Sequence, residues 1–179
     1  MKGVIFTEFL DLVEENFGYE TVDTIIEKSS LSTNGAYSAI GTYPHSEMFQ
    51  LIGNLSQEKN IPVEVLLRLF GKHVFSVLMK SFPNHTRHIS HTFQLLESIE
   101  NHIHVEVRKI YPDAELPHFQ ITRLDNNTIE MIYTSSRKMA DLAIGLIEGC
   151  FEHFNEEGTV QKTNLNDDGS KVRLLILKK

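Results

Sequence analysis

Apolar residues recur every three or four positions through the first 110 residues, which is the period of helices that bury one face. This period predicts helices at residues 3–16, 21–28, 46–57, 62–81 and 90–110. Gly18 is expected to end the first helix and Ser46 to cap the third. Residues 29–43, which are rich in Ser, Thr and Gly, are expected to form a loop.

The helix predicted after Pro62 is apolar on nearly every side, so we expect it to be buried. Phe82-Pro83-Asn84 is expected to end this helix, and Tyr111-Pro112-Asp113 to end the helix of residues 90–110. Proline lacks the backbone N–H that a continuing helix needs.

The period changes to alternation after Pro117, which indicates strands. A hairpin is expected from residues 119–124 and 129–133 about Asp125-Asn126-Asn127, and a second hairpin from residues 160–164 and 172–177. One amphipathic helix, residues 138–154, lies between them. The sequence therefore predicts one α+β domain over residues 1–179, with a mostly helical first two thirds and a C-terminal antiparallel sheet.

Composition and charge narrow the class of protein. The chain is 41% hydrophobic and 23% charged, as is usual for globular domains, and its net charge of -7 argues against non-specific nucleic-acid binding. The single Cys150 excludes an intramolecular disulfide and a zinc site of several cysteines. Glu8 and Asp11 come too early for a signal peptide, and no apolar run approaches the roughly 20 residues of a membrane span, so we expect a cytoplasmic protein without membrane insertion.

Histidine is abundant, with nine residues, and two groups of histidines are candidate ligands. His85, His88 and His91 are spaced by three, but they have no acidic or cysteine partner nearby, which favours a solvated helix start over a metal site. His102 and His104 flank Ile103 of an apolar stripe at equal angles of about 100°. Helical spacing alone leaves both open as ligands or as ordinary boundary side chains.

The segment Tyr133-Thr134-Ser135-Ser136-Arg137 is expected at the end of a strand. In extended geometry Tyr133, Ser135 and Arg137 point to one side, where two hydroxyls and a guanidinium suit carboxylate recognition. The alternative, a serine that caps the next helix and an arginine in solvent, is the commoner use of such residues.

Four motifs together resemble the haem nitric oxide and oxygen binding family, H-NOX, of bacterial gas sensors and soluble guanylate cyclase. They are Met1 to Ile5, His104 with Pro117 thirteen residues later, Tyr133 to Arg137, and Gly145 to Gly149. The resemblance covers essentially the whole chain. Only His104, and not His102, has the family's spacing to Pro117 and Tyr133.

The resemblance implies a haem b that lies between the helical part and the sheet-bearing part. Its iron would be bound by His104, its propionates by Tyr133, Ser135 and Arg137, and its distorted shape would be imposed partly by Pro117 and Ile5. Residues 1–60 would form a distal helical subdomain and residues 61–179 a proximal one. The family's distal wall corresponds here to apolar residues only, namely Ile5, Phe9, Val74, Leu78, Leu142 and Leu146.

The apolar wall bears on the choice of gas. Bound oxygen gains from a hydrogen-bond donor, and the distal tyrosine of oxygen-binding relatives corresponds here to Leu142. We therefore expect binding of nitric oxide and carbon monoxide without a stable oxygen complex. His73 neighbours Val74 but should face about 100° away from it.

The family's mechanism implies that nitric oxide weakens the iron bond to His104, which frees the helix and shifts the molecule between two arrangements. No enzyme segment follows Arg173 to Lys179, so we expect the output to pass to a separate histidine kinase or cyclic di-GMP enzyme. A cysteine-rich zinc site, as some relatives have, cannot form from Cys150 alone. The alternatives are an enzyme, either a haem peroxidase or a metal-assisted hydrolase that uses the three spaced histidines, and a haem-free interaction domain.

Overall fold

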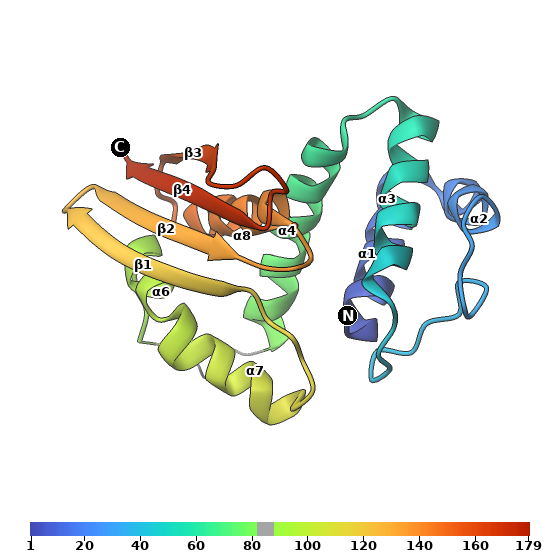
Figure 1. Ribbon diagram of the computed structural model, residues 1–179, viewed down its shortest axis with the longest axis horizontal. Helices are drawn as coiled ribbons and strands as arrows, with labels where there is room; N and C mark the ends of the chain where they lie inside the picture. The colour runs from blue at the N-terminus through green and yellow to red at the C-terminus, as the bar shows by residue number, and fades with distance from the viewer. Residues whose placement is uncertain (82–87) are drawn as a thin grey trace.

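The computed structural model describes residues 1–81 and 88–179. Helices and strands are distributed as the sequence predicts for an α+β fold (Figure 1). The helices are α1 (Gly3–Phe17), α2 (Tyr19–Glu27), α3 (His45–Lys59), α4 (Val63–Ser81), α6 (Thr92–Glu97), the π-helical turn η1 (Ile99–Ile103), α7 (His104–Ile110) and α8 (Ala140–His153). The strands are β1 (His118–Asp125), β2 (Thr128–Thr134), β3 (Gly158–Asn164) and β4 (Lys171–Lys178).

The four strands form one antiparallel sheet in the order β1-β2-β4-β3. Alternate residues of the central strands, among them Met131 and Leu174, are fully buried and pack with Ile144 and Phe151 of α8. The alternation that predicts the two hairpins thus reflects a sheet with one face covered by a helix.

A separate apolar core lies among α1, α2, α3 and α4 on the other side of the molecule (Figure 1). Its central side chains, including Phe6, Phe9 and Phe70, are almost completely buried. Helix α4 contributes Phe70 and Val74 to this core and packs along α8 as well, so it joins the helical part to the sheet-bearing part.

Helices α4 and α8 cross in close contact through two glycines. A Cβ atom on Gly71 would lie 2.3 Å from the carbonyl oxygen of Leu142, and one on Gly145 would lie 2.2 Å from that of Arg68. Only residues without a side chain allow the two backbones to approach this closely.

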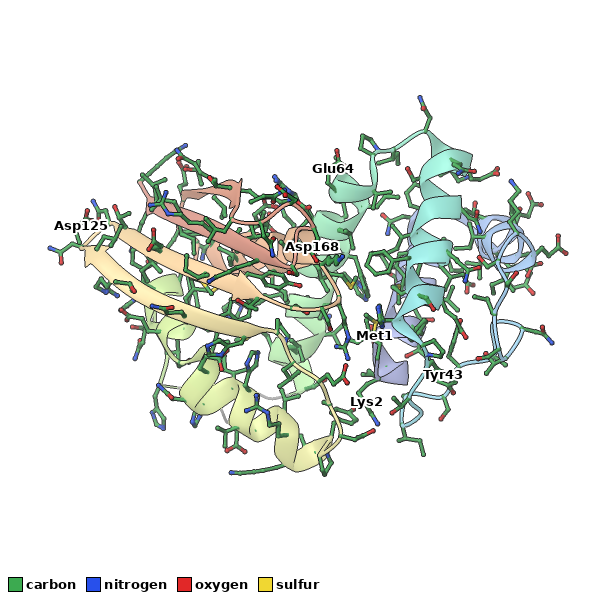
Figure 2. The ribbon with its side chains drawn as sticks, viewed as in Figure 1. Met1, Lys2, Tyr43, Glu64, Asp125 and Asp168 are labelled. Atoms are coloured by element: carbon green, nitrogen blue, oxygen red, sulfur yellow. The ribbon has the colours of Figure 1, made fainter. Side chains whose placement is uncertain are left out.

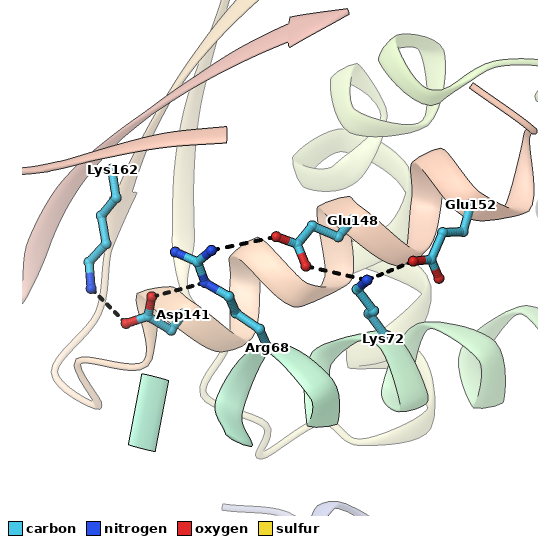
Figure 3. A network of polar contacts seen from close by, with 6 residues as sticks. All are labelled: Arg68, Lys72, Asp141, Glu148, Glu152 and Lys162. Carbon is cyan, nitrogen blue, oxygen red and sulfur yellow. Dashed lines mark hydrogen bonds and ion pairs between the residues drawn. The ribbon is translucent and has the colours of Figure 1, made fainter. Parts of the chain in front are cut away.

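Ion pairs run along the edge of the same crossing and extend to β3 (Figure 3). They are Arg68–Asp141 at 3.6 Å, Arg68–Glu148 at 3.7 Å, Lys72–Glu148 at 3.6 Å, Lys72–Glu152 at 2.6 Å and Lys162–Asp141 at 2.6 Å. Asp141 is buried, but the side chains of the Lys72 and Arg68–Glu148 pairs are partly exposed, so each of those pairs contributes at most about 1 kcal/mol.

The start of α1 is tied to the segment that follows α7. Nζ of Lys2 donates to Oγ1 of Thr42 at 2.8 Å and lies 3.1 Å from Oδ1 of Asp113. The Thr42 hydroxyl in turn donates to Oδ2 of Asp113 at 3.0 Å. Met1, Lys2 and Tyr43 lie together at this place (Figure 2), and the N-terminal amino group of Met1 donates to the carbonyl of Tyr43.

The sequence predictions are confirmed, within a few residues, for the first two helices, the loop of residues 29–43 and both hairpins. The prediction for Ser46 was wrong, because α3 begins at His45 with Pro44 at its N-cap and no side-chain cap. Helix α4 ends at Ser81, and Phe82-Pro83-Asn84 lies outside the described residues.

Two other helical predictions need correction. Helix α4 is not buried on every side, since Val65 is 42% and Leu69 48% exposed. The predicted helix of residues 90–110 is divided into α6, η1 and α7, because the π-helical turn uses longer-range hydrogen bonds, such as Ile103 N–H to Ser98 carbonyl at 3.2 Å. None of the helices in the described part of the chain combines the length and apolar content of a membrane span.

Candidate functional site

Burial distinguishes the two histidines that helical spacing treats alike. His104 is the first residue of α7, directly after η1, and is only 8% exposed, whereas His102 is exposed. The prediction that a ligand histidine lies on this helix therefore points to His104, as the motif spacing also indicates.

The surroundings of His104 favour a neutral imidazole. Nδ1 lies 3.2 Å from Oε1 of Glu100, although its N–H is not aligned with that oxygen and has no other hydrogen-bond partner. Burial lowers the pKa of His104 and outweighs the opposing effect of Glu100. Because a carboxylate can only accept, the proton belongs on Nδ1, and Nε2 keeps the lone pair that a metal ligand needs.

The Tyr133 to Arg137 segment is compact rather than extended. Tyr133 is buried on β2, but the strand ends at Thr134, and the backbone N–H of Arg137 donates to Oγ of Ser135 at 3.2 Å. The prediction that extended geometry aligns the three side chains was therefore wrong, because Ser135 begins a turn. The turn leads back to Tyr133, whose hydroxyl accepts the backbone N–H of Met139 at 2.9 Å. Burial raises the pKa of Tyr133, while Ser135, the Met139 N–H and Arg137 act against that rise.

Arg137 already holds a carboxylate. Its Nη1 donates to the carbonyl of Glu115 at 2.6 Å and its Nη2 to the Glu115 carboxylate at 3.1 Å, while its buried Nε has no partner. The Glu115 side chain is 80% exposed, against 16% for Arg137. An anchored guanidinium with an unpaired N–H beside an exposed, replaceable carboxylate fits the binding of a haem propionate.

The six residues predicted for the distal wall lie in one apolar cluster. Phe9 and Val74 are buried in it, and the other four are partly buried against it: Ile5, Leu78, Leu142 and Leu146. They come from α1, α4 and α8. Pro117 immediately precedes β1.

Two polar contacts at the site were not foreseen from the sequence. Nε2 of His73 on α4 lies 2.9 Å from Oε2 of Glu8 on α1, which directs the imidazole toward α1. The second contact is that of Glu100 with His104. Its signal was available, because side chains four residues apart meet on one side of a helix.

The group of spaced histidines is only partly described, since His85 lies outside the described residues. Nδ1 of His91 accepts the backbone N–H of Gln94 at 3.2 Å and so caps α6. Within residues 1–81 and 88–179, no three His, Cys, Asp or Glu side chains are placed to share a metal ion. Burial raises the pKa of the Cys150 thiol to about 12, so this thiol is uncharged at neutral pH.

The sequence and structure were also compared with known proteins. The family model described as Haem-NO-binding matches residues 2–162. No curated protein matches the chain.

Three solved structures illustrate the similarity. The Fe(II) unliganded H-NOX protein from K. algicida is 48% identical, with a TM-score of 0.95 over 100% of this chain and 97% of that one. The IWP-051-bound H-NOX from Shewanella woodyi in the Fe(II)CO state is 41% identical, with a TM-score of 0.84 over 100% and 95%. An H-NOX protein from S. oneidensis in the Fe(II)NO state is 27% identical, with a TM-score of 0.91 over 100% and 99%.

Proposed function

This chain belongs to the H-NOX family of haem-based gas sensors, and we propose that it senses nitric oxide through a haem b whose iron is bound by His104. The observation that carries the proposal is the buried imidazole of His104 with Nδ1 beside Glu100, which would leave Nε2 as the ligating nitrogen. Bound haem iron supplies the gas-binding position and a histidine bond that nitric oxide can weaken.

The opposite end of the site would bind the propionates. Arg137 and the hydroxyls of Tyr133 and Ser135, at the end of β2 and in the turn after it, would offer a charged fork and neutral partners. A propionate in place of the Glu115 carboxylate would retain the ion pair and give the buried Nε a partner.

The apolar cluster supports selectivity for nitric oxide and carbon monoxide. Leu142 donates no hydrogen bond from its side chain, and His73 is engaged by Glu8. Oxygen on ferrous iron carries charge that needs such a donor, whereas the other two gases need it less. A peroxidase would need a distal acid and base, and the residues of the proposed distal wall are all apolar, which favours a sensor over an enzyme.

A path for the signal follows from the position of His104. Release of its imidazole would free α7, and the segment after α7 is tied through Asp113 to Lys2 and Thr42. Movement of α7 would therefore reach the proposed distal subdomain, residues 1–60, from the proposed proximal subdomain, residues 61–179. We propose that a separate histidine kinase or cyclic di-GMP enzyme in the cytoplasm reads this change.

Absorption spectroscopy of the purified protein tests the proposal. We expect a Soret band, a carbon monoxide complex, a five-coordinate nitric oxide complex, and oxidation in air without a stable oxygen complex. Leu142→Tyr, which adds a distal donor, is expected to prolong the oxygen complex. Absence of a Soret band would favour a haem-free interaction domain, and a stable oxygen complex in the unmodified protein would contradict the proposed selectivity.

A further inference from the structure

Glu100 lies at the junction between the turn that precedes His104 and the first strand. Its Oε1 accepts the backbone N–H of Phe119 at 2.8 Å and lies 3.2 Å from Nδ1 of His104. Its Oε2 lies 3.4 Å from Nδ1 of His118. The carboxylate thus contacts the proposed iron ligand and two consecutive residues of β1.

These contacts fix the carboxylate independently of His104. The Phe119 N–H belongs to the strand backbone, so it holds Oε1 in place whether or not the imidazole is present. Glu100 itself belongs to η1, and its side chain is only 22% exposed. Partial burial strengthens a charged hydrogen bond, because less water competes for the oxygen.

A carboxylate at Nδ1 changes the chemistry of Nε2. Hydrogen bonding of the Nδ1 proton to an anion increases electron density on the ring and makes Nε2 a stronger donor to a metal. The Nδ1 N–H lies near Oε1 but makes no hydrogen bond to it, so the imidazole would have to turn toward Glu100 when it binds iron.

We propose that Glu100 is a positioning residue that orients His104 and strengthens its bond to the haem iron, thereby raising the threshold at which nitric oxide releases the histidine. This inference rests on the proposed iron ligation by His104. Because Phe119 holds the carboxylate on β1, a released imidazole would move away from Glu100 as well as from the iron. Glu100 therefore opposes the first movement of α7.

Glu100→Gln tests this role, because the amide oxygen can still accept from Phe119 while the negative charge is lost. The readout is the iron–histidine stretching frequency of the ferrous, unliganded holoprotein, measured by resonance Raman spectroscopy. We expect a lower frequency in the variant, about 10-fold faster loss of haem to apomyoglobin, and faster histidine release with nitric oxide.

Glu97→Gln is the matched control. Glu97 is also a carboxylate that ties this group of helices to β1, but its ion pair is with Arg123 at 2.7 Å, whereas the ion pair of His104 is with Glu100. Its variant is expected to keep the original frequency. The same frequency in Glu100→Gln and in the unmodified protein would overturn the inference and leave the haem proposal intact, whereas no iron–histidine band in the unmodified protein would overturn both.

A second measurement covers the case in which Glu100→Gln does not fold. In His104→Gly, free imidazoles can take the place of the side chain. We expect 4-methylimidazole, which keeps an N–H for Glu100, to bind about 10-fold more tightly than 1-methylimidazole, which has the same bulk and no N–H. Equal affinities would overturn the inference.

Discussion

Glu47 is a buried carboxylate that holds the loop between α2 and α3. Its Oε2 accepts the hydroxyl of Tyr37 at 2.7 Å and its Oε1 the backbone N–H of Ser32 at 3.1 Å, and the residue is only 4% exposed. Burial pushes the pKa of Glu47 upward, but the hydrogen bonds from Tyr37 and Ser32 outweigh it and leave the pKa below its usual value.

Because the pKa of Glu47 is lower in the folded protein than in the unfolded chain, the free energy of unfolding decreases as the pH falls. The stabilisation is present above the unfolded pKa of about 4.3 and is lost as the pH falls through the lower folded value. We expect Glu47→Gln to lose about 1–3 kcal/mol at pH 7 and to depend less steeply on pH below about 5, measured by thermal unfolding. Glu14→Gln, at an exposed position of α1, is the control, and the same steepness in Glu47→Gln as in this control would contradict the assignment.

The residues of the site could be predicted only where spacing carries the information. His104 is indicated only by the H-NOX family's spacing to Pro117 and Tyr133. Helical angles leave His102 equally good, because they carry no information on which side chain is buried. The contact between Arg137 and Glu115 joins residues 22 positions apart, at the two ends of the β1–β2 hairpin, and no local pattern signals it.

Helices α4 and α8 cross so closely that a Cβ atom on a glycine of either helix would overlap the backbone of the other. Gly145 lies against the backbone of Arg68, so an added methyl group would have to displace backbone rather than a flexible side chain. This crossing also positions Leu142 and Val74, which come from the two helices and share the apolar cluster.

Gly145→Ala is therefore expected to destabilise the protein by about 1–3 kcal/mol, despite the better helix propensity of alanine. Gly53→Ala is the matched control, because Gly53 is also helical and a Cβ there meets nothing within 4 Å. The control should be more stable by about 0.5–1 kcal/mol, which is the usual cost of a helical glycine. Chemical denaturation of the two variants measures both changes, and equal effects would refute the close crossing.

Helices and strands with one uninterrupted hydrophobic period were predicted well from the sequence, whereas a break within a helix was not. The hairpins follow from alternation, since one face of the sheet is buried on α8. The π-helical turn at residues 99–103 was missed, because one altered hydrogen-bond register leaves the apolar spacing of the helix nearly unchanged.

In the described residues, the two larger apolar cores lie among the N-terminal helices and between the sheet and α8, with α4 beside both (Figure 1). Apart from α4, contacts such as Lys2 with Asp113 connect the two parts. The order of helices and strands predicts the α+β class, but such contacts between distant residues have no periodic signal. A haem at this boundary, as proposed, would let a single bond to His104 influence both parts.

Removal of that bond is the most direct measurement of the central claim. His104→Gly, purified with free imidazole, is expected to hold haem and to lose it when the imidazole is removed, as followed by the Soret band. His102→Gly, two residues away on the exposed side, should retain haem throughout. Retention of haem by His104→Gly without imidazole, with an unchanged iron–histidine band, would contradict the claim, and so would loss of that band in His102→Gly alone.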